Sequence, residues 1–392
     1  MIKIDTSKIS EWDDIKQKHI NFIQKVIDDN RELMNELPNK VREYIEKNKR
    51  NIFIGERQVM LKSANELRSI IFGNINELEL NILDKFYYSE KRKKDNIINE
   101  IKNTFTDSKY DEVKKRFINN INEVYEEHKD IKQEKRKEFI NNYYSNYMEG
   151  LDTNKLLNEL FKYDKLSTGT NKWDRHQLLS SMGIGVCPYC NRNYISNYKE
   201  NNKNKTTADL DHFYPKSIYP ILALSLYNFI PSCQICNSRF KLNVDVYLTE
   251  HIYPYEESFD GYEYKFRTYP NEMDIGYLKG ESNKFDLKIE SSNVGRDNKK
   301  VENSKSTFRL EELYNNHKDY VQEIIKKVNL YNDDRINTIR NEFESLFDSK
   351  KEVFQLIFSN YIEEDDLLKK PLSKLTKDIC NEFGINIENI EE

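Results

Sequence analysis

The sequence predicts a mainly helical protein, in which helical N- and C-terminal regions flank a small zinc-stapled module of two strands and a helix. Three observations predict this fold class. Apolar residues recur at helical spacing over most of the chain, the residues from 166 to about 250 differ in composition, and two Cys-x-x-Cys pairs lie in that central part.

The composition is that of a polar but folded protein. Charged residues make up 33% of the 392 residues and hydrophobic residues 37%, while 12% are aromatic. A disordered chain lacks large apolar groups to bury, so the aromatic content predicts a folded protein, and the length allows two or three domains. The net charge of −5 is not the strongly basic balance of a nucleic-acid-binding domain, although a local positive patch is compatible with it.

Helical periodicity dominates the chain from about residue 7 to residue 165. The first apolar stripe consists of Trp12, Ile15, Phe22, Ile23, Val26, Leu33, Leu37 and Val41. We expect Pro38 to interrupt this stripe, because an interior proline removes a hydrogen bond and clashes with the preceding turn. The basic run KRKK at 91–94 is interpreted as a solvated helix face, with contact to phosphates as the alternative.

These patterns divide the chain into four parts. We expect a helical N-terminal domain at 1–165, the cysteine-containing module at 166–255, a short β-rich connection at 256–300 and a helical C-terminal region at 301–392. Alternation in YEYKFRTY and FDLKIES marks the connection as strands. In the C-terminal region, one predicted stripe consists of Ile336, Ile339, Phe343 and Leu346.

No segment has the pattern of a signal peptide or a membrane helix. The N-terminal residues MIKIDTSKIS lack an apolar core, and the longest nearly apolar stretch, YPILALSLYNFI, is shorter than the roughly 20 residues that a membrane helix needs. The nucleotide-binding pattern G-x-x-x-x-G-K-[ST] does not occur in the sequence. We therefore expect a cytoplasmic protein that does not contact membranes and does not hydrolyse nucleotides itself.

The cysteines predict a structural zinc site. CPYC at 187–190 and CQIC at 233–236 each place two thiolates on a tight turn, and together Cys187, Cys190, Cys233 and Cys236 complete a tetrahedral site with no open position. The alternatives are unligated core cysteines or a redox pair, but a redox Cys-x-x-Cys normally occurs once and near a βαβ pattern. Cys380 lies far away, and we interpret it as a buried apolar thiol.

The 42 residues between the two cysteine pairs exceed the spacing of a simple zinc ribbon, so they must contain an insertion. TTADLDHF alternates like a strand that ends at Asp211 and His212, and LYNFIPS provides a returning strand with Asn228. QICNSRFKLN has the pattern of a helix, with Asn237 and Lys241 one turn apart on one face.

These residue types suit the hydrolysis of a phosphodiester. A water molecule must lose a proton near neutral pH, and His212 is the side chain whose reference pKa fits that role. Asp211 and Asn237 offer the carboxylate and amide oxygens that Mg²⁺ or Mn²⁺ prefers, and such a cation neutralises the charge on the leaving oxygen. Asn228 would hold the hairpin or the histidine in place through its amide.

The same region is locally basic. Between residues 187 and 245 there are seven Lys and Arg residues and four Asp and Glu residues, so the local balance is 7 − 4 = +3. This polarity suits a phosphate-binding groove. We expect Lys216, Arg239 and Lys241 to contact nucleic acid.

DLDHFYPKS followed by LYNFIPSCQICNSRFK resembles the HNH endonuclease motif, in the ββα-metal form stapled by four cysteines. The resemblance covers about residues 183–245. It implies a catalytic role for His212 as general base, Asp211 as ligand of the catalytic metal, and Asn228 as the middle asparagine. Asn237 stands at the third position, where the family name has His, and still provides an oxygen ligand.

A longer resemblance, to the HNH nuclease subunits of Septu-type antiphage defence systems, is carried by four further stretches. They are WDRHQLLSSMGIGVCPYCNRNYI, HIYPYEESF, FRLEELYNNHKDYVQEII and PLSKLTKDI. In such systems an HNH protein works beside an ATPase that senses infection. The resemblance therefore implies a separate ATPase subunit as partner, with the helical flanks available for its docking.

Three more residues are of types that occur in active sites or metal sites. Asp209 lies two residues before Asp211, on the same strand face, and is either a group that orients a neighbour or a solvated carboxylate. His251 and His176 are interpreted as hydrogen-bonded packing residues, because a lone histidine beside aromatic or apolar residues is more often part of the core.

Taken together, the residues predict a metal-dependent phosphodiester hydrolase with structural Zn²⁺ and catalytic Mg²⁺ or Mn²⁺. The two resemblances imply that it is an HNH endonuclease that hydrolyses DNA and acts in antiphage defence with an ATPase. Two alternatives remain open: a zinc module that binds nucleic acid or protein without cutting, and a nuclease that cuts RNA such as tRNA. A homo-oligomer is also compatible with the sequence.

Overall fold

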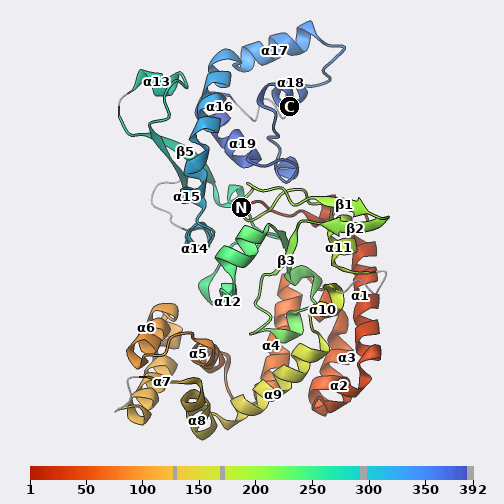
Figure 1. Cartoon of the computed structure of the whole chain (residues 1–392), viewed down its shortest axis with the longest axis vertical. Helices are drawn as coiled ribbons and strands as arrows, with labels where there is room; N and C mark the ends of the chain where they lie inside the picture. The colour runs from red at the N-terminus through yellow and green to blue at the C-terminus, as the bar shows by residue number, and fades with distance from the viewer. Residues whose placement is uncertain (127–129, 168–172, 273, 292–297, 386–392) are drawn as a thin grey trace.

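In the computed structural model the protein is mainly helical, with small two-stranded sheets and a cluster of four cysteines. The structure describes residues 1–126, 130–167, 173–272, 274–291 and 298–385. The molecule is elongated: the C-terminal helices lie at one end, the strands around the cysteines lie in the middle, and two groups of N-terminal helices form the other end (Figure 1).

The first group of helices follows the predicted apolar stripe. Its members are α1 (Trp12–Asp29), α2 (Arg31–Glu36), α3 (Asn39–Ile54) and α4 (Arg57–Phe72). The break expected at Pro38 is confirmed, because α2 ends at Glu36 and Pro38 immediately precedes α3. Ile15, Ile23 and Val41 are fully buried, as amphipathic helices facing a common core require.

The second group forms a separate lobe with its own core. It consists of α5 (Glu77–Tyr88), α6 (Lys94–Thr104), α7 (Asp111–Val124) and α8 (Gln133–Tyr143), and α9 (Ser145–Leu160) leads back to the rest of the chain. Buried residues between Phe72 and Leu151 make one apolar cluster, and the larger cluster joins residues 1–67 to residues 157–385. The buried clusters therefore do not follow the boundary predicted at residue 165.

The central region is irregular. It contains α10 (Asp164–Ser167), α11 (Arg175–Met182), the hairpin of β1 (Asn197–Glu200) and β2 (Lys203–Thr206), the hairpin of β3 (Asp209–His212) and β4 (Phe229–Ser232), a π-helix η5 (Cys236–Lys241) and α12 (Val246–Thr249). The β1–β2 hairpin turns at Asn201 and Asn202, whose φ values of 49° and 61° suit the tight turns that asparagine tolerates.

The C-terminal part begins with the antiparallel hairpin of β5 (Tyr264–Pro270) and β6 (Phe285–Ser291), which contain the two alternating stretches. The helices here are α13 (Ile275–Leu278), α14 (Lys299–Thr307), α15 (Leu310–Tyr314), α16 (Lys318–Leu330), α17 (Asp333–Glu342), α18 (Lys350–Phe358) and α19 (Ser373–Glu382). The stripe predicted from Ile336 to Leu346 is only half correct. Ile336 is buried, but α17 ends at Glu342, so the chain turns and Phe343 and Leu346 are exposed.

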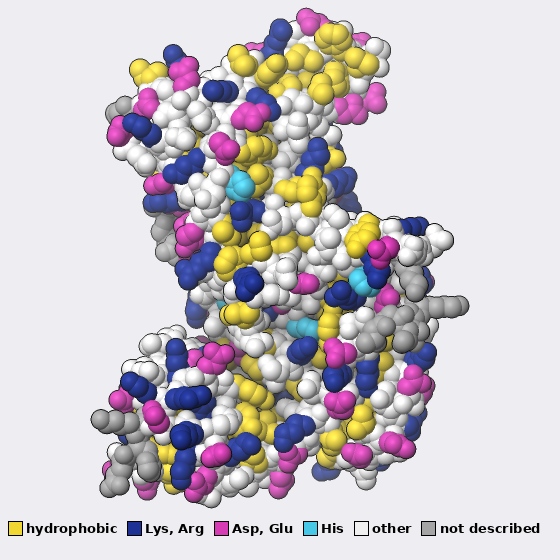
Figure 2. Space-filling model, viewed as in Figure 1, with side chains coloured by type: hydrophobic (Ala, Val, Ile, Leu, Met, Phe, Trp, Pro, Cys, Tyr) yellow, Lys and Arg dark blue, Asp and Glu magenta, His cyan; other side chains and the backbone are white. Residues whose placement is uncertain are grey.

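The surface is a mixture of charged and apolar side chains, and a hollow separates the α5–α8 lobe from the region above it (Figure 2). Among the described helices, none combines the length and the apolar composition needed to cross a bilayer.

Candidate functional site

The β3–β4 hairpin and helix η5 position the predicted site residues. The strands are antiparallel, and His212 pairs with Phe229, Asp211 with Ile230 and Asp209 with Ser232. Leu210 and all of β4 are buried, which fixes the register because a slip of one residue would reverse the faces of the hairpin. Helix η5 begins four residues after β4 ends, so strand, strand and helix follow one another within one compact unit.

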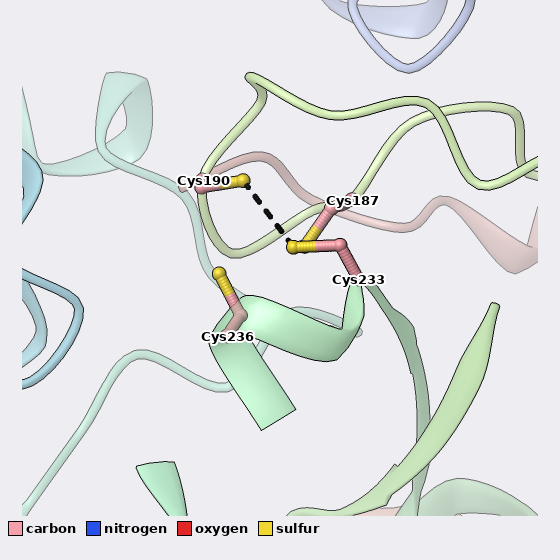
Figure 3. A group of neighbouring side chains, drawn as sticks. All are labelled: Cys187, Cys190, Cys233 and Cys236. Atoms are coloured by element: carbon pink, nitrogen blue, oxygen red, sulfur yellow. Dashed lines mark hydrogen bonds between the residues drawn. The ribbon is translucent and has the colours of Figure 1, made fainter. Parts of the chain in front are cut away.

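Four cysteine side chains converge at the base of this unit. Cys187 and Cys190 lie on the turn before β1, and Cys233 and Cys236 lie between the end of β4 and the start of η5, with all four sulfur atoms directed toward one another (Figure 3). Their sulfurs lie within 4.8 Å of one another and all four residues are buried. Tetrahedral zinc with Zn–S bonds of about 2.3 Å requires sulfur separations of about 3.8 Å. The cluster therefore fits a metal ion such as zinc.

N–H donors approach two of the four sulfurs, those of Cys190 and Cys233, whereas burial and the neighbouring thiols raise the pKa of Cys187 and Cys236. The backbone N–H of Arg192 lies 3.4 Å from the Cys190 Sγ, and the Asn193 amide donates to the Cys233 Sγ at 3.3 Å. Hydrogen bonds from the Cys187 thiol, from the other two thiols and from Asn193 lower the pKa of Cys233 below its ordinary value. The thiolate is the form that binds a metal.

The imidazole of His212 is held in one tautomer. Its Nε2 lies 2.9 Å from the backbone oxygen of Ala223, and because a carbonyl only accepts, Nε2 carries the proton and Nδ1 the lone pair. The ring packs edge-on against Tyr163 and Phe229. Burial lowers the pKa of His212 to about 3, so the ring is neutral at neutral pH. A neutral imidazole with a free lone pair is able to accept a proton.

The carboxylate of Asp211 is buried and neutralised by a lysine. Lys241 places its Nζ 3.1 Å from Asp211, and both side chains are almost fully buried, at 1% and 3% exposure. The same ammonium group donates to the backbone oxygen of His212 at 2.7 Å. The Tyr189 hydroxyl, from the turn between the first two cysteines, donates to Asp211 Oδ2 at 2.5 Å. Lys241 and Tyr189 thus fix the end of β3 from two sides.

Asn228 holds the loop that follows β3 through side-chain hydrogen bonds. Its side chain accepts a hydrogen bond from the Tyr214 N–H at 2.7 Å and donates to the backbone oxygens of Tyr214 and Leu222. Leu222 immediately precedes Ala223, the residue that fixes the His212 ring. Asn228 therefore acts on His212 through the backbone and is not itself in contact with the open space of the site.

Three of the residues predicted for catalysis or metal binding share one cavity of about 280 Å³. Asp211, His212 and Asn237 line it together, along with Lys216 and Tyr163. The Asn237 amide donates to Asp209 Oδ2 at 3.0 Å, so Asp209 orients Asn237 rather than His212. The cavity thus combines a neutral imidazole, a carboxylate and an amide, the set from which a base and hard oxygen ligands for a divalent cation can be drawn.

The three residues expected to contact nucleic acid lie in different surroundings. Lys216 is exposed at the cavity, with its Nζ 5.3 Å from the centre of the Tyr163 ring. Arg239 is exposed on η5. Lys241 is buried against Asp211, so in this structure its ammonium group is not open to a phosphate.

The other weighed residues lie outside the cavity. His251 is buried, with its two ring nitrogens against the hydroxyls of Thr249 and Thr307. His176 is half-buried on α11. Cys380 is fully buried in α19, where burial raises the pKa of its thiol.

Sequence reasoning missed Tyr163 and Tyr189. Tyr163 precedes α10 and contacts His212 across 49 residues of chain, and nothing in the local pattern marks it. Tyr189 had one available signal, because it lies inside CPYC, and the turn that carries the cysteines also carries its ring. Comparisons with protein families, with curated proteins and with solved structures gave no match to this chain.

Proposed function

We propose that the protein is a metal-dependent endonuclease of the HNH type that hydrolyses DNA phosphodiester bonds. The observation that carries the proposal is the state of His212: Nε2 is fixed on the Ala223 carbonyl, and the ring lines a cavity together with Asp211 and Asn237. A general base needs a held ring, a free lone pair and an open space for the substrate, and His212 combines these features.

In this proposal Nδ1 of His212 takes a proton from the attacking water. The lowered pKa keeps the resting ring neutral but makes it a weak base. A phosphate anion bound in the cavity would raise that pKa and strengthen the base, because a nearby negative charge favours the imidazolium. Lys216 stands at the same cavity and supplies positive charge toward the phosphate. Asn228 and Tyr163 keep the ring in place.

Asp211 and Asn237 are the residues that would hold a divalent cation. A carboxylate offers about four acceptor positions, so Asp211 retains some beyond those used by Tyr189 and Lys241. Two protein ligands suit Mg²⁺ or Mn²⁺, since Mg²⁺ usually keeps several water molecules. When bound, such a cation would neutralise the charge that develops on the leaving oxygen.

The test is nicking of a supercoiled plasmid by the zinc-loaded protein in Mg²⁺ or Mn²⁺. We expect His212→Ala to lower the rate by about 10²- to 10⁴-fold, the usual contribution of a general base, while zinc content and melting temperature stay close to wild type. His317→Ala is the matched control: His317 is also half-buried and hydrogen-bonded through Nε2, here to Arg192, but it lies outside the cavity. Unchanged nicking by His212→Ala would remove the residue from the mechanism.

One observation favours a second candidate, a zinc module that binds without cutting. Lys241 already neutralises Asp211, and a carboxylate with a buried counter-charge has less need of a metal cation. The same assay separates the two functions, because a binding module retains affinity for DNA and cuts neither DNA nor RNA. A parallel assay on tRNA identifies an RNA nuclease, which would use the same groups.

The role in antiphage defence and the ATPase partner follow from the resemblance to Septu-type nuclease subunits, and we propose them on that basis. The test is affinity purification of the chain expressed from its own genomic neighbourhood. An ATPase that co-purifies at constant stoichiometry supports the proposal, and its reproducible absence contradicts it.

A further inference from the structure

A second, larger cavity lies between the α5–α8 lobe and the rest of the molecule, in the region where Figure 2 shows the surface hollowed. Its volume is about 650 Å³, more than twice that of the cavity at His212. The lining residues come from α5, α6, α12 and α14 and the adjoining loops. No part of the proposed reaction uses this cleft.

The cleft is positively charged. Three lysines line it, Lys85, Lys91 and Lys299, against one acidic residue, Glu100. Lys85 forms an ion pair with Glu100 at 3.0 Å, and Lys299 lies 3.6 Å from the exposed Glu250. Lys91 forms no ion pair within 4 Å in the described ranges, and its charge acts on Glu100 only at longer range.

The KRKK run extends this charge along the rim. Lys91 belongs to the run, and Arg92 and Lys93 after it are exposed and likewise form no ion pair in the part of the chain that the structure describes. A solvated helix face usually places acidic partners three or four residues away. Here Lys91, Arg92 and Lys93 precede α6, and Lys94 is its first residue, so most of the run lies on a loop at the edge of the cleft. This placement favours the phosphate-contact interpretation of the run.

The remaining lining residues suit a sugar-phosphate backbone better than exposed bases. They are mostly asparagines and threonines, residue types that donate hydrogen bonds to phosphate oxygens: Asn96, Asn99, Asn103, Asn303, Thr104, Thr106 and Thr249. Thr104, Thr249 and Asn303 already donate to backbone oxygens of the protein, so a phosphate would be met by Asn96, Asn99, Asn103 and Thr106. Among the described residues that line the cleft, none is aromatic. Proteins that bind single strands usually stack the bases on aromatic rings, so this lining favours the outside of a duplex.

One short chain segment links the cleft to the proposed active site. Leu242 and Asn243 line the cavity at His212, and Leu248 and Thr249 line the cleft. Four residues of chain lie between Asn243 and Leu248, so the five steps from one Cα atom to the other span at most about 17 Å. Along a duplex, with a rise of about 3.4 Å per base pair, this corresponds to about five base pairs.

We propose that the cleft between α6 and the α12–α14 segment binds the phosphate backbone of double-stranded DNA, no more than about five base pairs from the bond that is cut. The inference rests on the proposed nuclease function and deepens it, because it assigns the α5–α8 lobe to substrate binding. Lys91 and Lys299 would contact phosphates and release counterions from the DNA.

The experiment measures the salt dependence of binding to a fluorescent duplex of about three helical turns, without added magnesium or manganese. The zinc-loaded full chain is compared with the double variant Lys91→Gln/Lys299→Gln. Each lost phosphate contact lowers the slope of log K against log[salt] by about 0.9, so we expect the double variant to lower it by about 2.

The matched control is Lys137→Gln/Lys155→Gln, which also removes two positive charges. Lys137, on α8, resembles Lys91 because it forms no ion pair in the described part of the chain. Lys155, on α9, resembles Lys299 because each forms one ion pair on the surface, with Asp152 and Glu250 respectively. Neither lines the cleft. We expect this variant to keep the wild-type slope. Equal slopes for both variants, or tighter binding to single strands than to the duplex, would overturn the inference.

Plasmid nicking measured on the same preparations separates the two proposals. If the wild type nicks DNA but the Lys91/Lys299 variant binds with an unchanged slope, the nuclease proposal stands and the cleft assignment is wrong. If the wild type binds duplex with the expected slopes but never nicks, the cleft assignment stands and the nuclease proposal is wrong.

Discussion

At the scale of single residues, the pair of Asp211 and Lys241 dominates the energetics of the site. Both groups are nearly excluded from water, so each depends on the other to offset the loss of its hydration. The pair also fixes geometry, since Lys241 donates both to the carboxylate and to the backbone oxygen of His212. Positioning of the strand end is therefore the role that the structure supports for Lys241.

Replacing Lys241 with methionine tests this role. Lys241→Met leaves the Asp211 carboxylate buried without a counter-charge, and we expect it to lower the free energy of unfolding by about 3–5 kcal/mol. The double variant Lys241→Met/Asp211→Asn should recover much of the loss, because no charge is left uncompensated. Urea denaturation of the zinc-loaded proteins measures both values.

The control for this change is Lys216→Met, which removes an exposed lysine from the same module. Its effect should stay within about 0.5 kcal/mol, as for most surface substitutions. If Lys241→Met is no more destabilising than Lys216→Met, Asp211 has another counter-charge and the pair does not fix the strand.

The sequence placed Asp211, His212 and Asn237 close together, and all three line one cavity, but it did not predict the direction of the Lys241 side chain. Asn237 and Lys241 were expected on one face of an α-helix. The helix η5 is instead a π-helix, with the Leu242 N–H bonded to the Asn237 oxygen, and its wider turn changes the direction of residue 241 relative to residue 237. Spacing alone does not distinguish the two helix types. The contact of Tyr163 with His212 depends on tertiary packing and was equally inaccessible.

At the scale of secondary-structure elements, the cysteine cluster connects short segments that also share the larger apolar core. It joins the turn before β1 to the end of β4 and the start of η5. The elements are short, and β3 and β4 have only four residues each. Isolated two-stranded hairpins are marginally stable in water, so the cluster supplies order that the hairpin cannot supply itself.

A pair of serine variants tests the cluster. Cys233→Ser removes one of four ligands, and we expect loss of bound zinc, a melting temperature lower by several degrees and loss of nicking. Cys380→Ser is the matched control, since it changes a buried thiol in α19 that lies outside the cluster. It is expected to lower stability by packing alone and to keep one zinc per chain, measured by elemental analysis. Zinc content that remains at the wild-type level in Cys233→Ser would contradict the ligand assignment.

The two cysteine pairs were predicted as one cluster from spacing, because a tetrahedral ion is the arrangement that two such turns can share. The hairpin within the gap followed from alternation and from Pro215 after the first strand. The extent of the C-terminal helices was harder to predict. Ile336 and Phe343 fit one periodic stripe, but the sequence does not contain a clear stop signal at Glu342, where α17 ends.

At the scale of the whole molecule, buried histidines join segments that are distant in the chain. His19, on α1, lies 2.7 Å from the Leu224 oxygen through Nε2 and accepts a hydrogen bond from the Trp173 indole. Burial lowers the pKa of His19 to about 4, and that of His251 to about 4 as well. These rings are neutral in the folded protein and acquire a proton more readily when it unfolds.

This difference predicts a pH dependence of stability. Between about pH 6.5 and pH 4 the unfolded chain binds a proton at His19 and the folded chain does not. As the pH falls through this window, His19 therefore lowers the free energy of unfolding by about 1.4 kcal/mol per pH unit. His19→Gln keeps a donor and an acceptor but does not titrate. The unfolding free energies of wild type and variant should therefore converge as the pH is lowered through this window.

Urea denaturation at several pH values measures the two curves. Acid also releases zinc by protonating the cysteines, but that loss is common to both proteins and cancels in the difference. Parallel curves between pH 6.5 and pH 4 would show that His19 is already protonated in the folded state.

Domain boundaries were the part of the architecture that the sequence described least well. The helical spacing of apolar residues continues up to residue 165, so the sequence pattern predicted one domain that contains α1–α9. The buried clusters instead combine residues 1–67 with the cysteine region and give the α5–α8 lobe a core of its own. Contacts between distant residues decide which apolar stripes pack against each other. One example is the hydrogen bond of Trp12 with Tyr227, 215 residues apart in the chain, which no local sequence pattern predicts.

The segment from Ala223 to Ser225 has a practical consequence. The consecutive carbonyls of Ala223 and Leu224 face His212 and His19, and the next residue donates its hydroxyl to the Ile52 oxygen of α3. The support for the imidazole is thus contributed in part by the first fifty-odd residues of the chain. The β3–β4–η5 unit consequently cannot be transferred to another scaffold by itself. A transplanted unit would also need the surfaces of α1 and α3 that it contacts here.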